Sequence, residues 1–230
     1  MIFGGLQKNS LIDFPGKIAA LVFTQGCNFH CPYCHNPDLI PMKGKGIFHE
    51  EDILLFLEKR KGLLEGLAIT GGEPTLQKDL AGFCGKVKGM GYPVKLDTNG
   101  SRPEVLKEVI SEKLVDYIAM DIKTHPSEYA PGLCKASMEQ ALESSIRIIL
   151  ESGLDHEFRS TCVHPFITEE KIEKILPLIH GAKTYALQTF STNSLHNPDF
   201  FNHEGRGLTL EEAERIRKLL APHVGQCIIR

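Results

Sequence analysis

The chain has 230 residues, of which 42% are hydrophobic and 24% are charged, and its formal net charge at pH 7 is −3. This length and apolar content suit a single globular domain, which we expect over residues 1–230 with a core of about residues 15–220. The charges are mixed, with no basic stripe or polybasic tail, so neither a nucleic acid nor a membrane is an expected partner. Residues 1–17 hold no long apolar run, so we expect no signal peptide and a cytoplasmic location.

Short apolar runs alternate with amphipathic helical patterns along the chain. In chain order, the first half predicts a strand over residues 18–24, a helix over 50–61, a strand over 66–70, a helix over 77–88, a strand over 93–97 and a helix over 103–112. The second half predicts a strand over 115–122, a helix over 137–151, a strand over 157–163, a helix over 168–179, a strand over 184–190 and a helix over 209–220. The polar stretch 193–207 is expected to be a loop that acts as a lid or binds a partner.

About six strands that alternate with about six helices predict an α/β fold with a mostly parallel sheet and helices outside it. Right-handed crossovers would curl such a sheet into a partial (β/α)6 TIM-like barrel of parallel strands with outer helices. A doubly wound open sheet is the alternative, and the periodicity does not separate the two.

A polar motif follows each of the first four predicted strands. In chain order these motifs are CNFHCPYCHNP (27–37), GGEP (71–74), DTNG (97–100) and DIK (121–123). The carboxyl ends of parallel strands meet at one rim of a barrel or open sheet, which is where the active sites of such folds lie. We therefore expect the four motifs to build one site.

Three of the seven cysteines, Cys27, Cys31 and Cys34, fall within eight positions. The other four are far apart in the sequence and are expected to be small, buried or half-buried apolar residues: Cys84, Cys134, Cys162 and Cys227. A disulfide framework is not expected in a reducing cytosol. The C-x3-C-x2-C spacing of the first three is too tight to be incidental and indicates a site.

Four kinds of site compete for this cluster. A c-type haem site needs the C-x-x-C-H found at residues 31–35, but it is typical of exported proteins and leaves Cys27 unexplained. A redox dithiol at residues 31–34 also leaves Cys27 unexplained, and thioredoxin-like chains are shorter. A zinc site could take His30 or His35 as its fourth ligand, but no second pair of ligands follows. An iron–sulfur cluster would use all three thiolates, and a four-iron cluster would then keep one iron open for a reactant.

The cysteine spacing, with Tyr33 before Cys34, resembles the signature of the radical S-adenosylmethionine (radical SAM) enzymes. The GGEP motif resembles the GGE segment of that superfamily, and DTNG and DIK resemble segments of its glycyl-radical-enzyme activases. The stretches NSLIDFPGK (9–17) and FTQGC (23–27) resemble the anaerobic ribonucleoside-triphosphate reductase activating proteins. Motifs carry the resemblance over residues 7–165.

The resemblance implies an enzyme that reductively cleaves S-adenosylmethionine at a [4Fe-4S] cluster held by Cys27, Cys31 and Cys34. The product would be a glycyl radical on a partner enzyme, expected to be anaerobic ribonucleoside-triphosphate reductase, and Asp13 would lie near its glycine-bearing peptide. A flavodoxin or ferredoxin would donate the electron. The alternatives are an activase of another glycyl radical enzyme, a small-molecule enzyme similar to 7-carboxy-7-deazaguanine synthase, and a zinc-binding module.

The resemblance also implies a set of residues that bind S-adenosylmethionine. Tyr33 would pack beside the adenine. The segment 71–73 would receive the methionine ammonium through glycine carbonyls and the Glu73 carboxylate. Lys123 and Arg159 are cations that would pair with the methionine carboxylate. The full expected set is Tyr33, Gly71, Gly72, Glu73, Asp97, Thr98, Asn99, Asp121, Lys123 and Arg159.

Asp97, Thr98 and Asp121 have two expected roles within this set. They would bind the ribose hydroxyls, or, by resemblance to pyruvate formate-lyase activase, their hard oxygens would hold a monovalent cation beside the sulfonium. The activase site also uses a histidine on a late strand. This chain has Phe190 there, with Gln188 as the alternative ligand.

Overall fold

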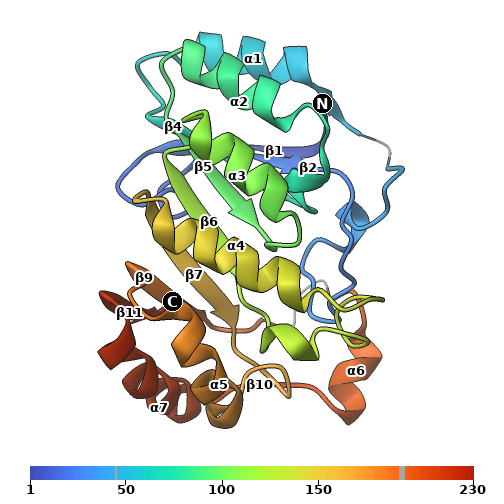
Figure 1. Cartoon of the computed structure of the whole chain (residues 1–230). Coiled ribbons are helices and arrows are strands. Elements are labelled where there is room, and N and C mark those ends of the chain that lie inside the picture. Colours follow the sequence, from blue (N-terminus) through green and yellow to red (C-terminus); the bar gives the residue numbers. More distant parts are fainter. Residues whose placement is uncertain (45, 192–194) are drawn as a thin grey trace. The chain divides into compact units, whose positions relative to one another are not determined.

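The computed structural model describes residues 1–44, 46–191 and 195–230 (Figure 1). The chain clusters into two compact units, each of which draws on several stretches of sequence. Unit 1 comprises Met1–Asn28, Asp38–Thr98 and Glu104–Ile118, and unit 2 comprises Phe29–Pro37, Asn99–Pro103 and Ala119–Arg230. The expected single domain over residues 1–230 stays a prediction.

Unit 1 is built on strands in the order β5-β4-β2-β1-β3. The strands β2 (Ala19–Thr24), β4 (Gly66–Gly71) and β5 (Val94–Thr98) pair in parallel. In contrast, β1 (Ile2–Ser10) is antiparallel to β2, and β3 (Phe48–His49) is antiparallel to β1. The three parallel strands are mostly buried on both faces, which explains why they read as continuous apolar runs.

Three helices belong to this part of the chain: α1 (Glu50–Lys59), α2 (Leu80–Gly89) and α3 (Pro103–Ser111). Each of them buries apolar residues at helical spacing, such as Phe83 and Val87 in α2. The ring of Phe83 lies 5.1 Å from the ring of Phe3, so α2 packs on the antiparallel strand β1.

Unit 2 contains the end of β6 (Tyr117–Asp121), which begins in unit 1. Next in its sheet are β7 (Asp155–Thr161), β9 (Thr184–Gln188) and β11 (Gln226–Ile229), which pair in parallel in the order β11-β9-β7. The backbone N–H of Ile122, just after β6, donates to the carbonyl of Arg159 in β7 at 2.7 Å. A separate antiparallel pair is formed by β8 (Val163–His164) and β10 (Arg206–Gly207).

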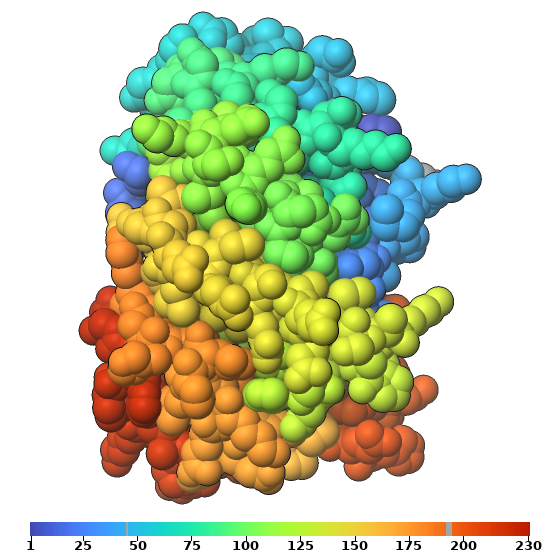
Figure 2. All heavy atoms as spheres, viewed as in Figure 1, coloured from blue at the N-terminus to red at the C-terminus, as the bar shows by residue number. Residues whose placement is uncertain are grey.

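The helices of unit 2 are α4 (Glu139–Glu151), α5 (Glu169–Ile179), α6 (Pro198–His203) and α7 (Leu210–Leu220). Thr168 and Thr209 cap α5 and α7, because each hydroxyl accepts a hydrogen bond from a backbone N–H in the first turn. The helices α5 and α7 lie side by side, and side chains of the helices largely cover the strands on the face shown in Figure 2. Among the described residues, no helix has the length and apolar content that crossing a lipid bilayer requires.

The α/β class, with a mostly parallel sheet and helices outside it, is confirmed. The six predicted strands correspond to β2, β4, β5, β6, β7 and β9, and the predicted helices to α1–α5 and α7. The prediction missed β1, which exposes many polar residues and has no apolar alternation, and the short strands β3, β8, β10 and β11. The predicted loop over 193–207 is wrong at Pro198–His203, which forms α6, and its positions 193 and 194 lie outside the described residues.

Candidate active site

Cys27 lies in unit 1, three residues after the end of β2, and it is half-buried. Its backbone N–H donates to the carbonyl of Ile40 at 3.0 Å, and the N–H of Gly26 donates to the carbonyl of Leu39 at 2.8 Å. The side-chain amide of Gln25 donates to two further carbonyls of the returning chain. Hydrogen bonds between residues 25–27 and the carbonyls of residues 38–41 therefore fix Cys27 at the carboxyl end of β2.

Cys31 and Cys34 lie in unit 2, where Cys31 is buried and Cys34 half-buried. The N–H of Cys34 donates to the carbonyl of Cys31 at 3.0 Å, which closes a turn. His196 and Asn197 donate their backbone N–H groups to the carbonyls of Cys34 and Pro32. The segment before α6 therefore fixes this turn from outside.

The donor chemistry of the three cysteines suits an iron–sulfur cluster. None of the three forms a disulfide, and thiolates are the usual protein ligands of such clusters. Within the described parts of the chain, no three His, Cys, Asp or Glu side chains are arranged to hold a single metal ion. The thiolates of a four-iron cluster bind different irons, so the cluster makes a different geometric demand.

Gly71 and Gly72 bring the end of β4 against the turn that precedes Cys27. Two backbone hydrogen bonds hold this segment against the turn. The N–H of Gly72 donates to the carbonyl of Thr24 at 2.9 Å, and the N–H of Glu73 donates to the carbonyl of Gly26 at 2.7 Å. A Cβ on Gly71 would lie 2.3 Å from the nitrogen of Thr24, and one on Gly72 would lie 2.1 Å from the Gly26 carbonyl oxygen. The two glycines are therefore needed for backbone packing beside the cysteine loop.

Replacing Gly71 with alanine is expected to lower the free energy of unfolding by about 3 kcal/mol or more. The new Cβ would meet backbone atoms of β2, and the φ of Gly71 is +119°, which side-chain-bearing residues rarely adopt. Chemical denaturation of the apo chain measures this loss. Gly82→Ala in α2 is the control, because its Cβ would meet nothing within 4 Å, and we expect it to add about 0.5–1 kcal/mol. Equal stability of the two variants would contradict the packing role of Gly71.

Glu73 is a buried residue, 1% exposed, and its carboxylate oxygen Oε1 accepts hydrogen bonds from two threonines. Thr75 donates to it from its backbone N–H at 3.1 Å and from its hydroxyl at 2.5 Å. The hydroxyl of Thr98, at the end of β5, donates to the same oxygen at 2.7 Å. The expected residues Glu73 and Thr98 are thus brought together in unit 1.

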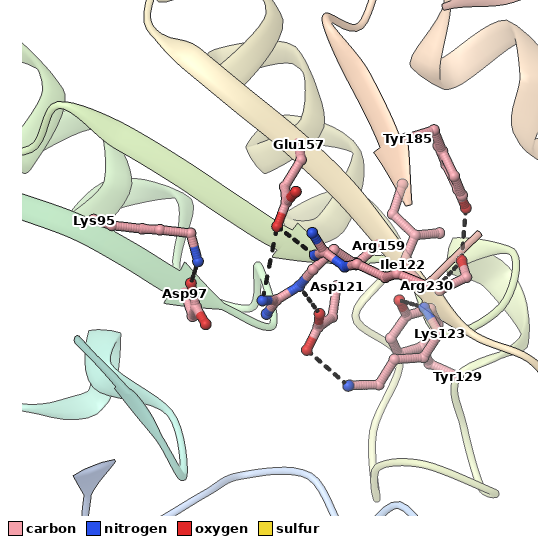
Figure 3. Close-up of polar contacts among 11 residues, drawn as sticks. Lys95, Asp97, Asp121, Ile122, Lys123, Tyr129, Glu157, Arg159, Tyr185 and Arg230 are labelled. Atoms are coloured by element: carbon pink, nitrogen blue, oxygen red, sulfur yellow. Dashed lines mark hydrogen bonds and ion pairs between the residues drawn. The ribbon is translucent and has the colours of Figure 1, made fainter. Parts of the chain in front are cut away.

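Asp97 lies beside a residue that sequence analysis missed. The ammonium of Lys95 forms an ion pair with the Asp97 carboxylate, and Lys95 is 1% exposed (Figure 3). The signal was present, because a lysine stands between Val94 and Leu96 in the predicted strand, two residues before the motif aspartate. Asn99 lies in unit 2 and closes a turn by accepting a hydrogen bond from the N–H of Ser101 at 2.9 Å.

In unit 2, Asp121 bridges the two cations that were expected to bind a carboxylate. Its Oδ1 accepts a hydrogen bond from Arg159 Nε at 2.8 Å, and its Oδ2 accepts one from Lys123 Nζ at 3.2 Å (Figure 3). Arg159 also lies 4.0 Å from the buried carboxylate of Glu157, which Arg230 contacts at 2.7 Å. Glu157 and Arg230 are 73 positions apart, so no local pattern in the sequence predicts their contact.

The charges of this cluster shift the pKa values of its members. Burial alone would raise the pKa of Asp121, but the Arg159 guanidinium and the Lys123 ammonium lower it to about 2. Burial would lower the pKa of Lys123, but the Asp121 carboxylate, followed by the Cys31 thiol, raises it well above its usual value. Asp121 and Lys123 therefore both stay ionised over the physiological pH range.

Tyr33 lies between the two cysteines of unit 2 and is 4% exposed. Its ring is 6.0 Å from the Lys123 ammonium and 5.4 Å from the ring of Phe166. Its hydroxyl is one of two buried side-chain polar atoms in the described chain with no hydrogen-bond partner, together with Thr124 Oγ1. Buried polar groups are normally satisfied, so this orphaned hydroxyl suits a site that a bound molecule completes.

A continuous group of aromatic rings flanks the turn of Cys31 and Cys34. Its ring-to-ring distances run from 4.7 to 6.2 Å. Phe190, which stands where the activase resemblance implies a histidine, stacks between His35 and Phe201. Sequence analysis missed the contribution of α6, although the pair Phe200-Phe201 was a visible signal. The members in order are Tyr33, Phe166, Phe200, Phe201, Phe190 and His35.

Asp13 lies at the amino end of β2, whereas Cys27 follows its carboxyl end. Its carboxylate accepts a hydrogen bond from the Ser10 hydroxyl at 2.5 Å, so it stabilises the turn between β1 and β2. Its expected place near the peptide substrate stays a prediction.

The remaining four cysteines behave mostly as apolar residues. Cys84, Cys134 and Cys162 are buried, and Cys227 is half-buried. Burial raises the pKa of Cys84 to about 12 and those of Cys162 and Cys227 to about 11. These thiols are therefore protonated at neutral pH.

Comparison with known proteins identifies the family. The model of the radical SAM superfamily matches residues 21–179. Over 223 residues the chain is 34% identical to a Methanocaldococcus jannaschii protein classed as a glycyl-radical enzyme activating enzyme, with 95% of this chain and 90% of the relative covered. It is 25% identical over 229 residues to the pyruvate formate-lyase-activating enzyme of Clostridium pasteurianum, with 93% of each chain covered.

A solved structure supports the fold. Streptococcus suis SuiB bound to S-adenosylmethionine aligns with a TM-score of 0.66 at 14% identity, over 89% of this chain and 48% of that one. The mostly parallel sheet with outer helices is consistent with the partial TIM barrel of radical SAM enzymes. Members of this family bind a [4Fe-4S] cluster and S-adenosylmethionine. The matched residues include all three cysteines of the C-x3-C-x2-C motif, and the chain therefore belongs to the radical SAM superfamily.

Proposed function

We propose that this chain is an activase that generates a glycyl radical on a partner enzyme. One observation carries this proposal: the similarity to an activating enzyme extends over 95% of this chain and 90% of the relative, with no large region left over on either side. A shared cofactor motif alone would give a shorter match, as it does for the superfamily model at residues 21–179. The substrate would be the backbone glycine of a large protein.

The cysteine thiolates of residues 27, 31 and 34 would hold the [4Fe-4S] cluster. When bound, the cluster and S-adenosylmethionine supply the one-electron chemistry that removes a hydrogen atom from a glycine. The orphaned hydroxyl of Tyr33 would find its partner in the bound cofactor. The aromatic rings around Cys31 and Cys34 would exclude water from this side of the site.

The polar residues that follow the strands would bind the ends of the methionine moiety. Lys123 and Arg159 would hold its carboxylate, because Asp121 orients both cations. Glu73 and the carbonyls of Gly71 and Gly72 would receive its ammonium. Asp97 and Thr98 would bind the ribose hydroxyls at the cofactor site.

The partner that we propose is anaerobic ribonucleoside-triphosphate reductase, on the strength of the stretches 9–17 and 23–27. The electron donor would be a flavodoxin or ferredoxin, and the protein would work in the cytoplasm. Asp13 would contact the partner peptide.

Anaerobic reconstitution followed by electron paramagnetic resonance tests this function. The reconstituted chain, dithionite and S-adenosylmethionine are mixed in parallel with an anaerobic ribonucleotide reductase and with a pyruvate formate-lyase. We expect a glycyl radical doublet in the reductase, absent when its radical glycine is replaced by alanine. Abundant 5′-deoxyadenosine without a radical in either partner would refute the proposed reductase partner and favour another glycyl radical enzyme or a small-molecule substrate. Retention of zinc without iron would favour a zinc-binding module.

A further inference from the structure

Lys95 is a buried lysine of unit 1. It is 1% exposed and belongs to β5, all five residues of which are buried. Lysine is almost never fully buried unless a partner balances its charge. The burial of Lys95 therefore requires a specific reason.

A carboxylate and an aromatic ring contact the Lys95 ammonium. Its ammonium forms an ion pair with Asp97, which lies two residues further along β5 and so projects from the same face of the strand (Figure 3). The ammonium also lies 5.8 Å from the centre of the Tyr117 ring, within the range of a cation–π contact. The Tyr117 ring in turn packs 6.1 Å from the ring of the buried Phe14.

These contacts close the amino side of the ion pair and leave Asp97 on the carboxyl side. Phe14 belongs to the DFPG segment, and it contacts the chain near Gly66 at the start of β4. The Lys95 ammonium thus packs against the Tyr117 ring, which Phe14 supports, and it forms its ion pair with the aspartate of the DTNG motif.

We propose that the Lys95 ammonium is a built-in cation, which neutralises Asp97 and replaces the monovalent cation that the activase resemblance implies at this aspartate. The inference rests on the proposed function in one respect, the assignment of Asp97 to the cofactor site. A hard cation requires several oxygen ligands around it. Here one oxygen of Asp97 already contacts an ammonium, whose charge would repel a second cation at the same carboxylate.

The consequence is that the positive charge that balances Asp97 of the DTNG motif is part of the chain and not a bound ion. A bound ion would exchange with the solvent, and its occupancy would follow the salt composition. A lysine fixed in β5 cannot exchange, so cofactor affinity and thermal stability become independent of which monovalent cation is present.

Cation substitution at constant ionic strength tests the first half of this inference. The thermal midpoint of the apo chain and the dissociation constant of S-adenosylmethionine on the reconstituted chain are measured in potassium, sodium and choline chloride. Choline is too large to bind between protein oxygens. We expect the thermal midpoint to be the same in the three salts and the dissociation constant to differ by no more than about twofold.

Lys95→Met tests the second half, because methionine keeps the length and apolar stem of lysine but not its charge. We expect its S-adenosylmethionine affinity to fall at least about tenfold in choline and to recover partly in potassium or sodium. Its thermal midpoint should likewise become dependent on the cation. The double variant Lys95→Met/Asp97→Asn removes both charges, preserves folding and should show no cation response. Lys86→Met removes another ion-paired lysine of unit 1, exposed and paired with Glu50, and is the matched control.

Two results would overturn the inference. One is a potassium- or sodium-specific rise in the thermal midpoint or affinity of the wild-type chain. The other is a Lys95→Met variant that behaves like Lys86→Met in all three salts. If the wild-type chain does not bind S-adenosylmethionine, the proposed function fails, but the cation dependence of the apo thermal midpoints still decides the role of Lys95.

Discussion

Replacing any one of Cys27, Cys31 or Cys34 with alanine is expected to abolish cleavage of S-adenosylmethionine, because the cluster loses one of its three protein ligands. The thiolates have no substitutes, since the other cysteines lie far from this loop in sequence and are mostly buried as neutral thiols. The loss should appear together with a loss of iron and sulfide from the reconstituted protein. Iron and sulfide analysis, with chromatographic quantification of 5′-deoxyadenosine, measures both effects.

Cys162→Ala is the control for this prediction. Cys162 is buried, and burial raises the pKa of its thiol to about 11, so it offers no thiolate at neutral pH. We expect this variant to keep its iron content and its cleavage activity. An equal loss of iron in the Cys162 variant would mean that the cluster ligands are assigned wrongly.

Replacing Asp121 with asparagine is expected to lower the free energy of unfolding by about 2–4 kcal/mol. The side chains of Arg159 and Lys123 are only 12% and 15% exposed, and both would lose their shared carboxylate. S-adenosylmethionine binding should weaken as well, because the two cations would no longer be held in place. Urea denaturation at neutral pH and equilibrium binding measure the two effects.

The stabilising effect of Asp121 should also disappear in acid. Its pKa is about 2 in the folded chain, below the value of about 3.9 for an unfolded chain. Its contribution, about 2 kcal/mol, is therefore complete above about pH 4 and is lost as the pH falls toward 2. The stability difference between the wild-type chain and Asp121→Asn should narrow over that interval.

Asp155→Asn is the matched control, because Asp155 is also paired with a lysine of unit 2 but its side chain is 73% exposed. We expect a change within about 0.5 kcal/mol at neutral pH, since exposed ion pairs contribute little. If Asp155→Asn lowered the free energy of unfolding as much as Asp121→Asn, burial would not make the Asp121 ion pairs more stabilising than an exposed pair.

The parallel strands and most helices could be predicted from the sequence, because both faces of these strands are buried and leave apolar runs. The strand β1 could not, since it exposes residues such as Gln7 and Lys8 and is defined by hydrogen bonds to β2. The helix α6 carried a readable signal that was overlooked, with Asn197 as its cap and Pro198 at its first position.

Some features of the candidate site could likewise be predicted from the sequence, and others could not. The cysteine spacing and the motifs after successive strands are local patterns, so they could be read without a structure. The ion pairs of Lys95 with Asp97 and of Glu157 with Arg230 could not be assigned, because a charge becomes informative only once its burial is known. The packing role of Gly71 likewise depends on the position of β2, 47 residues earlier in register with β4.

The sequence by itself determined the α/β class, the family and the identity of the three thiols, because periodicity and ligand spacing are properties of a continuous stretch of chain. The tertiary structure alone decided how the polar residues are paired. It showed Asp121 between two cations, Glu73 hydrogen-bonded to two threonines and Asp97 paired with a buried lysine. The physical reason is that the strength of an ion pair or hydrogen bond depends on distance and solvent exposure, and folding sets both.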